Sequence, residues 1–120
     1  MTDRELLELA AKAAGYAVRW HGNWQCFVHE RPFNTNNPPT LAGQRHVWSP
    51  LTDDGDALRL AVALRLQIDL ETPGTVFVSN FGWFAFMREN CRNDAEAATR
   101  RAIVCAAAEI GRSMQEQGGN

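Results

Sequence analysis

The chain lacks the segments that direct a protein into or across a membrane. No apolar run approaches the ~20 residues that a membrane-spanning helix needs. Residues 1–5, Met-Thr-Asp-Arg-Glu, do not have the charged-then-apolar layout of a signal peptide. The three cysteines are an odd number without the spacing of a disulfide framework. These absences predict free thiols in a reducing cytoplasm and no membrane partner.

Positive charge is scarce and comes almost entirely from arginine. Lys12 is the only lysine, and twelve basic residues face fourteen acidic ones, for a formal net charge of −2. Proteins that bind nucleic acid broadly carry a net positive field, so this balance argues against such a partner. Arginines 92, 100, 101 and 112 form a local exception, but acidic residues interrupt them. Nucleic-acid binding therefore stays a minor alternative.

Signatures of catalysis are also missing. The chain has no P-loop, no dinucleotide-binding fingerprint and no serine in a nucleophile-elbow context. Cys91 precedes a predicted helix, where the helix dipole and a neighbouring arginine lower a thiol pKa. No spacing assigns it a histidine base. The prediction is a non-enzymatic protein without catalytic residues, and a cysteine enzyme centred on Cys91 is the alternative.

Two patterns suggest metal binding and neither meets its requirements. Cys26-x-x-His29 has zinc-ligand spacing, but on a strand residues three apart point to opposite faces, and no second pair completes four ligands. Asp53, Asp54 and Asp56 surround Gly55, yet a calcium loop needs acids at alternate positions and a later glutamate. We expect no metal and no cofactor.

Periodicity predicts an α+β fold in a single domain, residues 1–120, with the order α-β-β-α-β-β-β-α and a mostly antiparallel sheet packed by helices. The expected elements are a helix at 3–14, a β-hairpin at 16–29, a helix at 56–65, a strand at 66–70, a hairpin made by 75–79 and 83–88, and a helix at 94–116. Both faces of the second hairpin are apolar, which leaves room for a flanking element, a target or a homodimer partner.

Helix ends and turns carry local signals. Thr2 or Asp3 suits the N-cap of the first helix, and Gly15 suits its C-terminus. Tight turns are expected at 21–23, where Gly22 and Asn23 tolerate positive φ, and at 80–82. The aspartates at 53–56 mark a helix start with an entry turn at Gly55, and residues 117–120 are expected to be a flexible tail.

Residues 30–47 form a long loop rich in proline and asparagine. Proline removes backbone donors and asparagine favours turns, so no regular element is expected. Loops of this length in compact domains are either functional or disordered, and both interpretations remain open.

Three segments resemble a group of small tailed-phage and prophage proteins. They are M-T-D-R-E-L-L-E-L-A-A-K-A-A-G at 1–15, W-S-P-L-T-D-D-G-D-A-L-R-L-A-V at 48–62 and A-A-T-R-R-A-I-V-C-A-A-A-E-I-G at 97–111. The group usually has asparagine at the place of Ser49 and arginine at the place of Cys105. The resemblance covers the three predicted helices and does not extend to the strands or to the 30–47 loop.

The resemblance implies a phage accessory protein acting in the host bacterial cytoplasm, and such proteins often bind a host macromolecule. The leading hypothesis is a non-enzymatic inhibitor of an antiviral defence system, similar to an anti-CRISPR protein, that binds a host protein. The predicted partner-binding residues are Phe33, Asn34, Asn36, Asn37, Arg45, Trp48 and Phe81. The alternative is a small-ligand protein that binds a nucleotide signal between arginines and tryptophans.

Overall fold

The computed structural model describes residues 1–29, 47–80, 86–90 and 94–118. The helices are α1 (Asp3–Ala14), α2 (Asp54–Leu64) and α3 (Ala95–Gly118). The strands are β1 (Val18–His21), β2 (Cys26–His29), β3 (Val47–Trp48), β4 (Leu66–Asp69), β5 (Thr75–Asn80) and β6 (Phe86–Asn90). The predicted α+β class is confirmed, with one more strand than expected and with two sheets in place of one.

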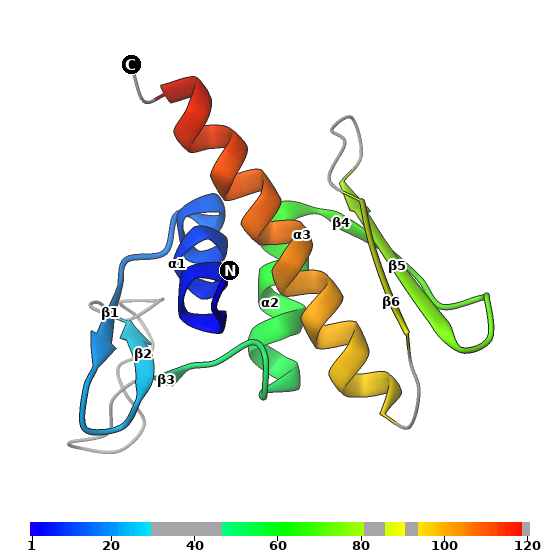
Figure 1. Cartoon of the computed structure of the whole chain (residues 1–120), viewed down its shortest axis with the longest axis horizontal. Coiled ribbons are helices and arrows are strands. Elements are labelled where there is room, and N and C mark those ends of the chain that lie inside the picture. Colours follow the sequence, from blue (N-terminus) through cyan, green and yellow to red (C-terminus); the bar gives the residue numbers. More distant parts are fainter. Residues whose placement is uncertain (30–46, 81–85, 91–93, 119–120) are drawn as a thin grey trace.

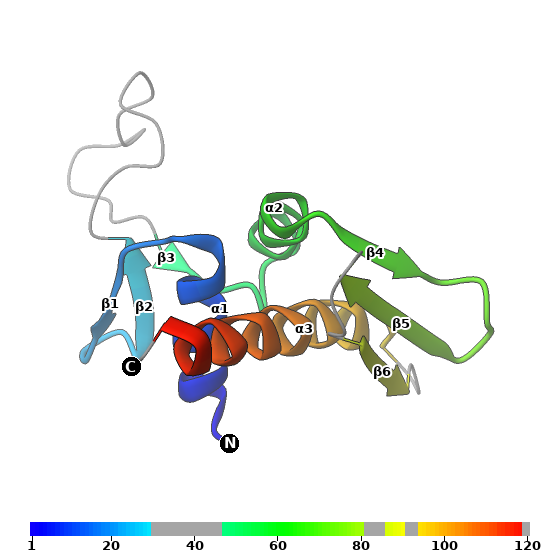
Figure 2. The ribbon, with the colours of Figure 1, turned by 90° about the horizontal axis from the view of Figure 1, so that it is seen from above.

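Helix α3 runs through the middle of the molecule and separates the two sheets (Figures 1 and 2). The sheet β1-β2-β3 lies with α1 on one side, and the sheet β4-β5-β6 lies on the other. Both sheets are antiparallel and follow chain order. The fold therefore places each half of the chain against the same central helix.

The third strand of the first sheet overlaps the predicted 30–47 loop. Val47 pairs with Val28 and Trp48 pairs with Phe27, so the segment's last residue belongs to β3. Residues 30–46 lie outside the described residues. A two-residue strand gives no periodic signal in the sequence, and only its pairing with β2 reveals it.

The first predicted turn needs correction. In the first hairpin His21 pairs with Cys26, so four residues form the turn, and its positive φ of 52° belongs to Gln25 and not to Gly22 or Asn23. In the second hairpin Ser79 pairs with Phe86. Residues 81–85, which include most of the predicted 80–82 turn and the start of the predicted 83–88 strand, lie outside the described residues.

The capping signals of α1 are confirmed. The Thr2 hydroxyl accepts a hydrogen bond from the backbone N–H of Glu5, and the Glu5 carboxylate reaches back to Thr2. This reciprocal capping box satisfies backbone donors that a helix start leaves open. Gly15 ends the helix in the left-handed conformation, with φ 76°.

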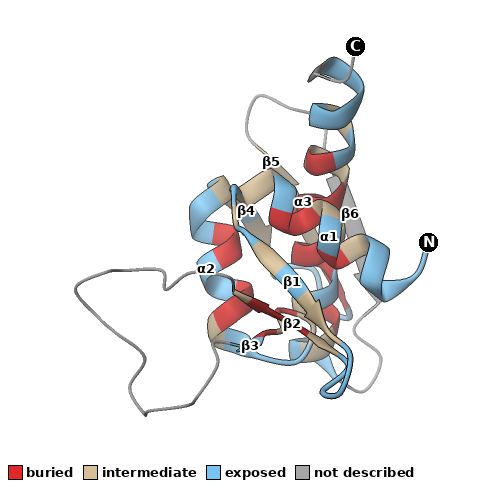
Figure 3. Ribbon diagram, turned by 90° about the vertical axis from the view of Figure 1, so that its left-hand side faces the viewer, coloured by how far each residue is buried: buried red, intermediate tan, exposed pale blue. Residues whose placement is uncertain are grey.

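Helix α3 is buried on more than the one face that its periodicity predicted. Its buried residues include Ala98, Ala102, Ile103, Val104, Ala106, Ala107 and Ala108 (Figure 3). The helical spacing of the apolar residues predicts an inner face that includes Ala95 and Met114, but both are exposed, and the helix continues two residues beyond Glu116. A helix packed between α1 and a sheet buries two sides, so a single apolar stripe cannot describe it.

The closest helix contact in the core depends on a glycine. A Cβ atom at Gly111 of α3 would overlap the carbonyl oxygen of Leu9 in α1. Small side chains at this crossing, including Ala10 and Ala107, are fully buried. In the described part of the chain, no helix is both long and apolar enough to cross a membrane.

Candidate functional site: an apolar groove between α2, β4 and α3

The aspartates at 53–56 have three different structural roles. Asp53 is the N-cap of α2, and its carboxylate accepts a hydrogen bond from the backbone N–H of Asp56 at 2.8 Å. Helix α2 begins at Asp54, two residues earlier than predicted. Gly55 therefore lies within the first helical turn, which corrects the expected entry turn.

Asp56 is a buried carboxylate with two partners. Its side chain accepts a hydrogen bond from the backbone N–H of Ser49 at 2.8 Å and one from the Arg59 guanidinium at 2.7 Å. The residue is 6% exposed, whereas the Arg59 side chain is half exposed. Asp56 thereby holds the segment before α2, at Ser49, against the first turn of that helix.

Asp54 connects α2 to α3 through Arg100. The Arg100 Nη1 donates to the Asp54 carboxylate at 2.6 Å, and its Nε donates to the Leu51 carbonyl at 2.9 Å. The 48–62 and 97–111 segments therefore contact each other here. This contact holds the N-terminal ends of α2 and α3 together.

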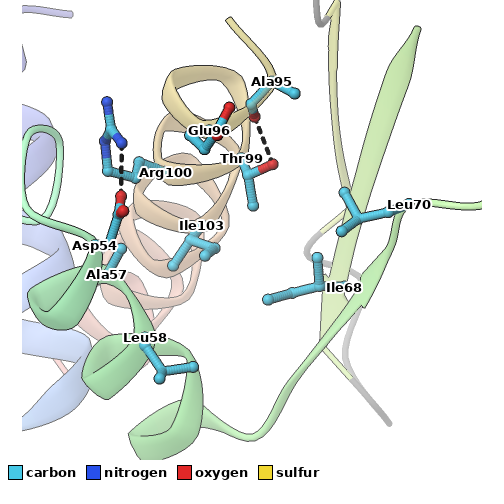
Figure 4. A pocket seen from close by; sticks show the side chains of 10 residues that line it. All are labelled: Asp54, Ala57, Leu58, Ile68, Leu70, Ala95, Glu96, Thr99, Arg100 and Ile103. Carbon is cyan, nitrogen blue, oxygen red and sulfur yellow. Dashed lines mark hydrogen bonds and ion pairs between the residues drawn. The ribbon is translucent and has the colours of Figure 1, made fainter. Parts of the chain in front are cut away.

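An open groove begins at this ion pair and runs between α2, α3 and β4 (Figure 4). Its volume is about 460 Å³. The lining residues are Asp54, Ala57, Leu58, Ile68, Leu70, Ala95, Glu96, Thr99, Arg100 and Ile103. Aliphatic side chains form most of this surface, and the charged groups gather at the end where α3 begins.

The groove lies where the described helices leave part of the inner face of β4 uncovered. Val78 of β5 is fully buried, and its cross-strand partner Ile68 occupies the same face but is only half-buried. Further along, Leu70 is 60% exposed. Of the three strands in this sheet, α3 packs chiefly against β5 and β6.

The outer face of α2 extends this apolar surface. Leu58 and Val62 lie one helical turn apart and are 62% and 66% exposed. Leu60 and Ala61 bury the opposite face of the helix. The sequence of α2 is apolar on most sides, with Ala57, Leu58, Leu60, Ala61, Val62 and Leu64, and periodicity does not tell which of those sides is left uncovered.

The charged end of the groove has an unmatched acidic group. Arg100 is directed to Asp54 and Leu51, and its side chain is 18% exposed. Glu96 is exposed and forms no ion pair with any other described residue. The groove therefore presents a free carboxylate beside apolar walls.

A second, more polar cavity of about 490 Å³ lies between α1 and β1. Arg4, Glu8 and Lys12 line it from α1, and Tyr16 and Trp20 line it from the chain that follows. The Arg4 guanidinium lies 4.5 Å from the Trp20 ring centroid and its Nε lies 3.5 Å from the Glu8 carboxylate. Cationic and aromatic groups are thus combined in one cavity.

Trp48 is a core residue, which corrects its prediction as a partner contact. It is 1% exposed, and its ring lies edge-on to Tyr16 at 5.9 Å and to Phe27 at 6.4 Å between centroids. A ring so enclosed stabilises the fold and cannot reach a partner. The other predicted contacts, Phe33, Asn34, Asn36, Asn37, Arg45 and Phe81, lie outside the described residues.

Within the described ranges, no three histidine, cysteine or acidic side chains gather as metal ligands would. Cys26 and Cys105 are partly buried thiols, and Cys91 lies outside those ranges. Comparisons with protein-family models, curated proteins and solved structures give no match.

Proposed function

We propose that this chain is a non-catalytic phage accessory protein that binds a host protein through the groove between α2, β4 and α3. The observation that carries the proposal is the open apolar surface formed by Leu58, Val62 and Leu70 around that groove. Large apolar side chains gathered at one concave place on a soluble domain are typical of protein–protein interaction sites.

The resemblance to phage proteins supports a host protein as the partner. Within that class we propose an antiviral defence protein, such as a CRISPR–Cas effector, which the chain would inhibit by occupying a surface that the effector needs. Inhibition by binding requires no catalytic group on this chain. The residues predicted in the 30–46 segment and Phe81 are proposed as additional contacts.

A defence assay with matched surface variants tests this function. The protein is expressed in bacteria carrying an active CRISPR–Cas system, and phage plating efficiency is measured. We expect the wild type to restore plating and Leu58→Ser with Val62→Ser to lose that effect. The control Val47→Ser changes an exposed apolar residue on the other sheet, which is 43% exposed, and should leave the effect intact.

Capture of the partner completes this test. The wild-type protein should retain a defence effector from host lysate, whereas the Leu58→Ser, Val62→Ser double variant should not. Thermal unfolding confirms that the variants fold, as expected for residues more than half exposed. Equal plating and equal capture by the wild type and the double variant would exclude the groove as the binding site.

The α1–β1 cavity favours a second candidate function, the binding of a nucleotide signal. Trp20 offers a ring for a base, and Arg4 and Lys12 offer cations for phosphate. A ligand that binds only the folded state raises the melting temperature. This function predicts that a nucleotide raises the melting temperature of the wild type and of the control Arg101→Ala. The same nucleotide should not raise the melting temperature of Arg4→Ala.

A further inference from the structure

We propose that the groove between α2, β4 and α3 accepts an amphipathic helix of the partner protein, with a lysine or arginine of that helix facing Glu96. This inference rests on the proposed function and specifies the partner's chemistry at the same site. It follows from the part of β4 that the described helices leave uncovered and from the charges at one end of the groove.

The uncovered space beside β4 lies where a further helix would pack in a two-layer fold. In the second half of the molecule α3 covers β5 and β6, and β4 overhangs a space that neither α2 nor α3 fills (Figures 2 and 4). Sheets in two-layer domains are covered by helices that pack side by side on one face. A helix placed between α2 and β4 would complete that layer and rest on Thr99 and Ile103 of α3.

The walls suit apolar side chains repeated at helical spacing. Leu58 stands on the α2 side, and Ile68 and Leu70 stand on the β4 side (Figure 4). A helix in a groove inserts its apolar face, with anchors at positions i, i+3 or i+4, and i+7. An extended segment would instead pair with the outer edge of β4, which is an edge strand of its sheet.

The charged end selects the sign of the partner's flanking residue. Asp54 is already paired with Arg100, which also donates its Nε N–H to the Leu51 carbonyl. Glu96 is left as a negative group at the groove wall. A cation on the helix is attracted to it, and a carboxylate at the same position is repelled, so Glu96 contributes specificity.

Three fluorescein-labelled peptides of equal length test this partner class with the intact protein. The first is an amphipathic helix with leucines at helical spacing and lysines on its flanks. The second replaces every lysine with glutamate, and the third places a proline at the centre of the first. Fluorescence anisotropy should show the first peptide binding at least about tenfold more tightly than either of the others.

Protein variants assign the effect to the groove. Glu96→Arg should reverse the preference between the lysine and glutamate peptides, and Leu58→Ser should weaken both. Glu8→Arg changes the net charge equally but lies on α1, beside the other cavity, and should keep the wild-type preference. Val47→Ser should likewise leave binding unchanged.

Each contrary result has a defined meaning. Equal binding of the proline peptide would show an extended ligand and overturn the helix. Equal effects of Glu8→Arg and Glu96→Arg would show attraction to overall charge and overturn the role of Glu96. If plating depends on Leu58 while no peptide shows the preference, this inference fails and the proposed function stands. If the peptides behave as expected while plating is unaffected by Leu58→Ser with Val62→Ser, the function fails and the groove's specificity stands.

Discussion

The aspartates in the 48–62 segment form one acidic cluster in the sequence, but they differ in their expected contribution to stability. Asp56 is enclosed and hydrogen-bonded to two groups, whereas the Asp54 side chain is 75% exposed and has one ion-pair partner. A buried carboxylate leaves its partners unsatisfied when it is removed, while an exposed pair is screened by water. The two aspartates are the same residue type, but their different burial predicts that Asp56 contributes more to stability than Asp54.

Asp56→Ala is expected to lower the free energy of unfolding by about 1–3 kcal/mol, because the partly buried Ser49 N–H loses its acceptor and Arg59 loses its closest partner. Asp54→Ala, the control, should cost less than about 1 kcal/mol, because the carboxylate it removes is exposed. Urea unfolding measures both. Equal losses would contradict the assigned difference.

Tyr16 gives the chain a specific alkaline response. Burial raises the pKa of its hydroxyl above the usual 10; Arg59 lowers this pKa, and Asp56 raises it further. Above pH 10 the unfolded state releases the phenolic proton first, so stability falls as the pH rises toward the folded pKa. Below pH 10 both states keep the proton, and this contribution does not vary.

We expect wild-type stability to decline above about pH 10 more steeply than that of Tyr16→Phe, which has no hydroxyl to titrate. Urea unfolding across this range gives the slopes. Tyr16 is the only tyrosine in the chain, so tyrosinate absorbance reports its pKa directly. A midpoint at or below the ordinary value would refute the effect of burial.

At the scale of elements, the start of α2 rests on one cap. Asp53 accepts from the N–H of Asp56, one of the donors that the first turn of a helix leaves open. Asp53→Ala is expected to lower the free energy of unfolding by about 1 kcal/mol. Asp53→Asn keeps an acceptor oxygen and should recover most of the loss in the same urea titration, whereas no recovery would point to charge instead of capping.

The crossing of α1 and α3 depends on the absence of a side chain at Gly111. Gly111→Ala should lower the free energy of unfolding by about 1–3 kcal/mol, because the new methyl group meets the Leu9 backbone, which cannot move as a side chain does. Thermal unfolding monitored by circular dichroism measures the loss.

Gly55→Ala in α2 is the matched control for that substitution. Its Cβ would lie 3.2 Å from both the Arg59 guanidinium and the Asp53 carboxylate, which are the ends of exposed side chains that can shift, and alanine favours the helix by about 1 kcal/mol over glycine. We expect its stability to be unchanged or raised. Destabilisation by both substitutions to the same degree would contradict the close crossing.

At the scale of the whole molecule, the segment between β2 and β3 connects strands that are already neighbours. Because Val28 pairs with Val47, a short turn can join them. Replacing residues 31–45 with about four Gly/Ser residues should leave thermal unfolding nearly unchanged. The same protein should capture the host partner more weakly if Phe33 and Arg45 are contacts, and undiminished capture would refute those predicted residues.

The association state belongs to the same scale. A homodimer is one of the possibilities that the two apolar faces of the second hairpin leave open, and the exposed Leu58, Val62 and Leu70 provide another apolar surface for it. Light scattering of the wild type and of Leu58→Ser decides between a dimer through this surface and a monomer that keeps the groove open for a partner.

The sequence by itself determined the three helices, to within two residues at the start of α2 and at the end of α3. Thr2, Asp53 and Gly15 satisfy backbone groups within three or four residues, and the α+β class follows from periodicities that are equally local. These signals depend only on residues that lie close together in the sequence. The spacing of the acidic residues also argued against a calcium loop at the aspartates without any tertiary information.

Only the tertiary structure decided which apolar residues are core and which form a surface. Trp48 and Leu58 look alike as apolar residues in one segment, yet α1 and the first sheet enclose Trp48, while no element covers Leu58. Strand register, the Arg100–Leu51 contact across 49 positions and the groove under β4 likewise depend on segments far apart in the chain. Burial is a property of neighbours in space, and a local pattern states that a residue prefers to be covered without stating what covers it.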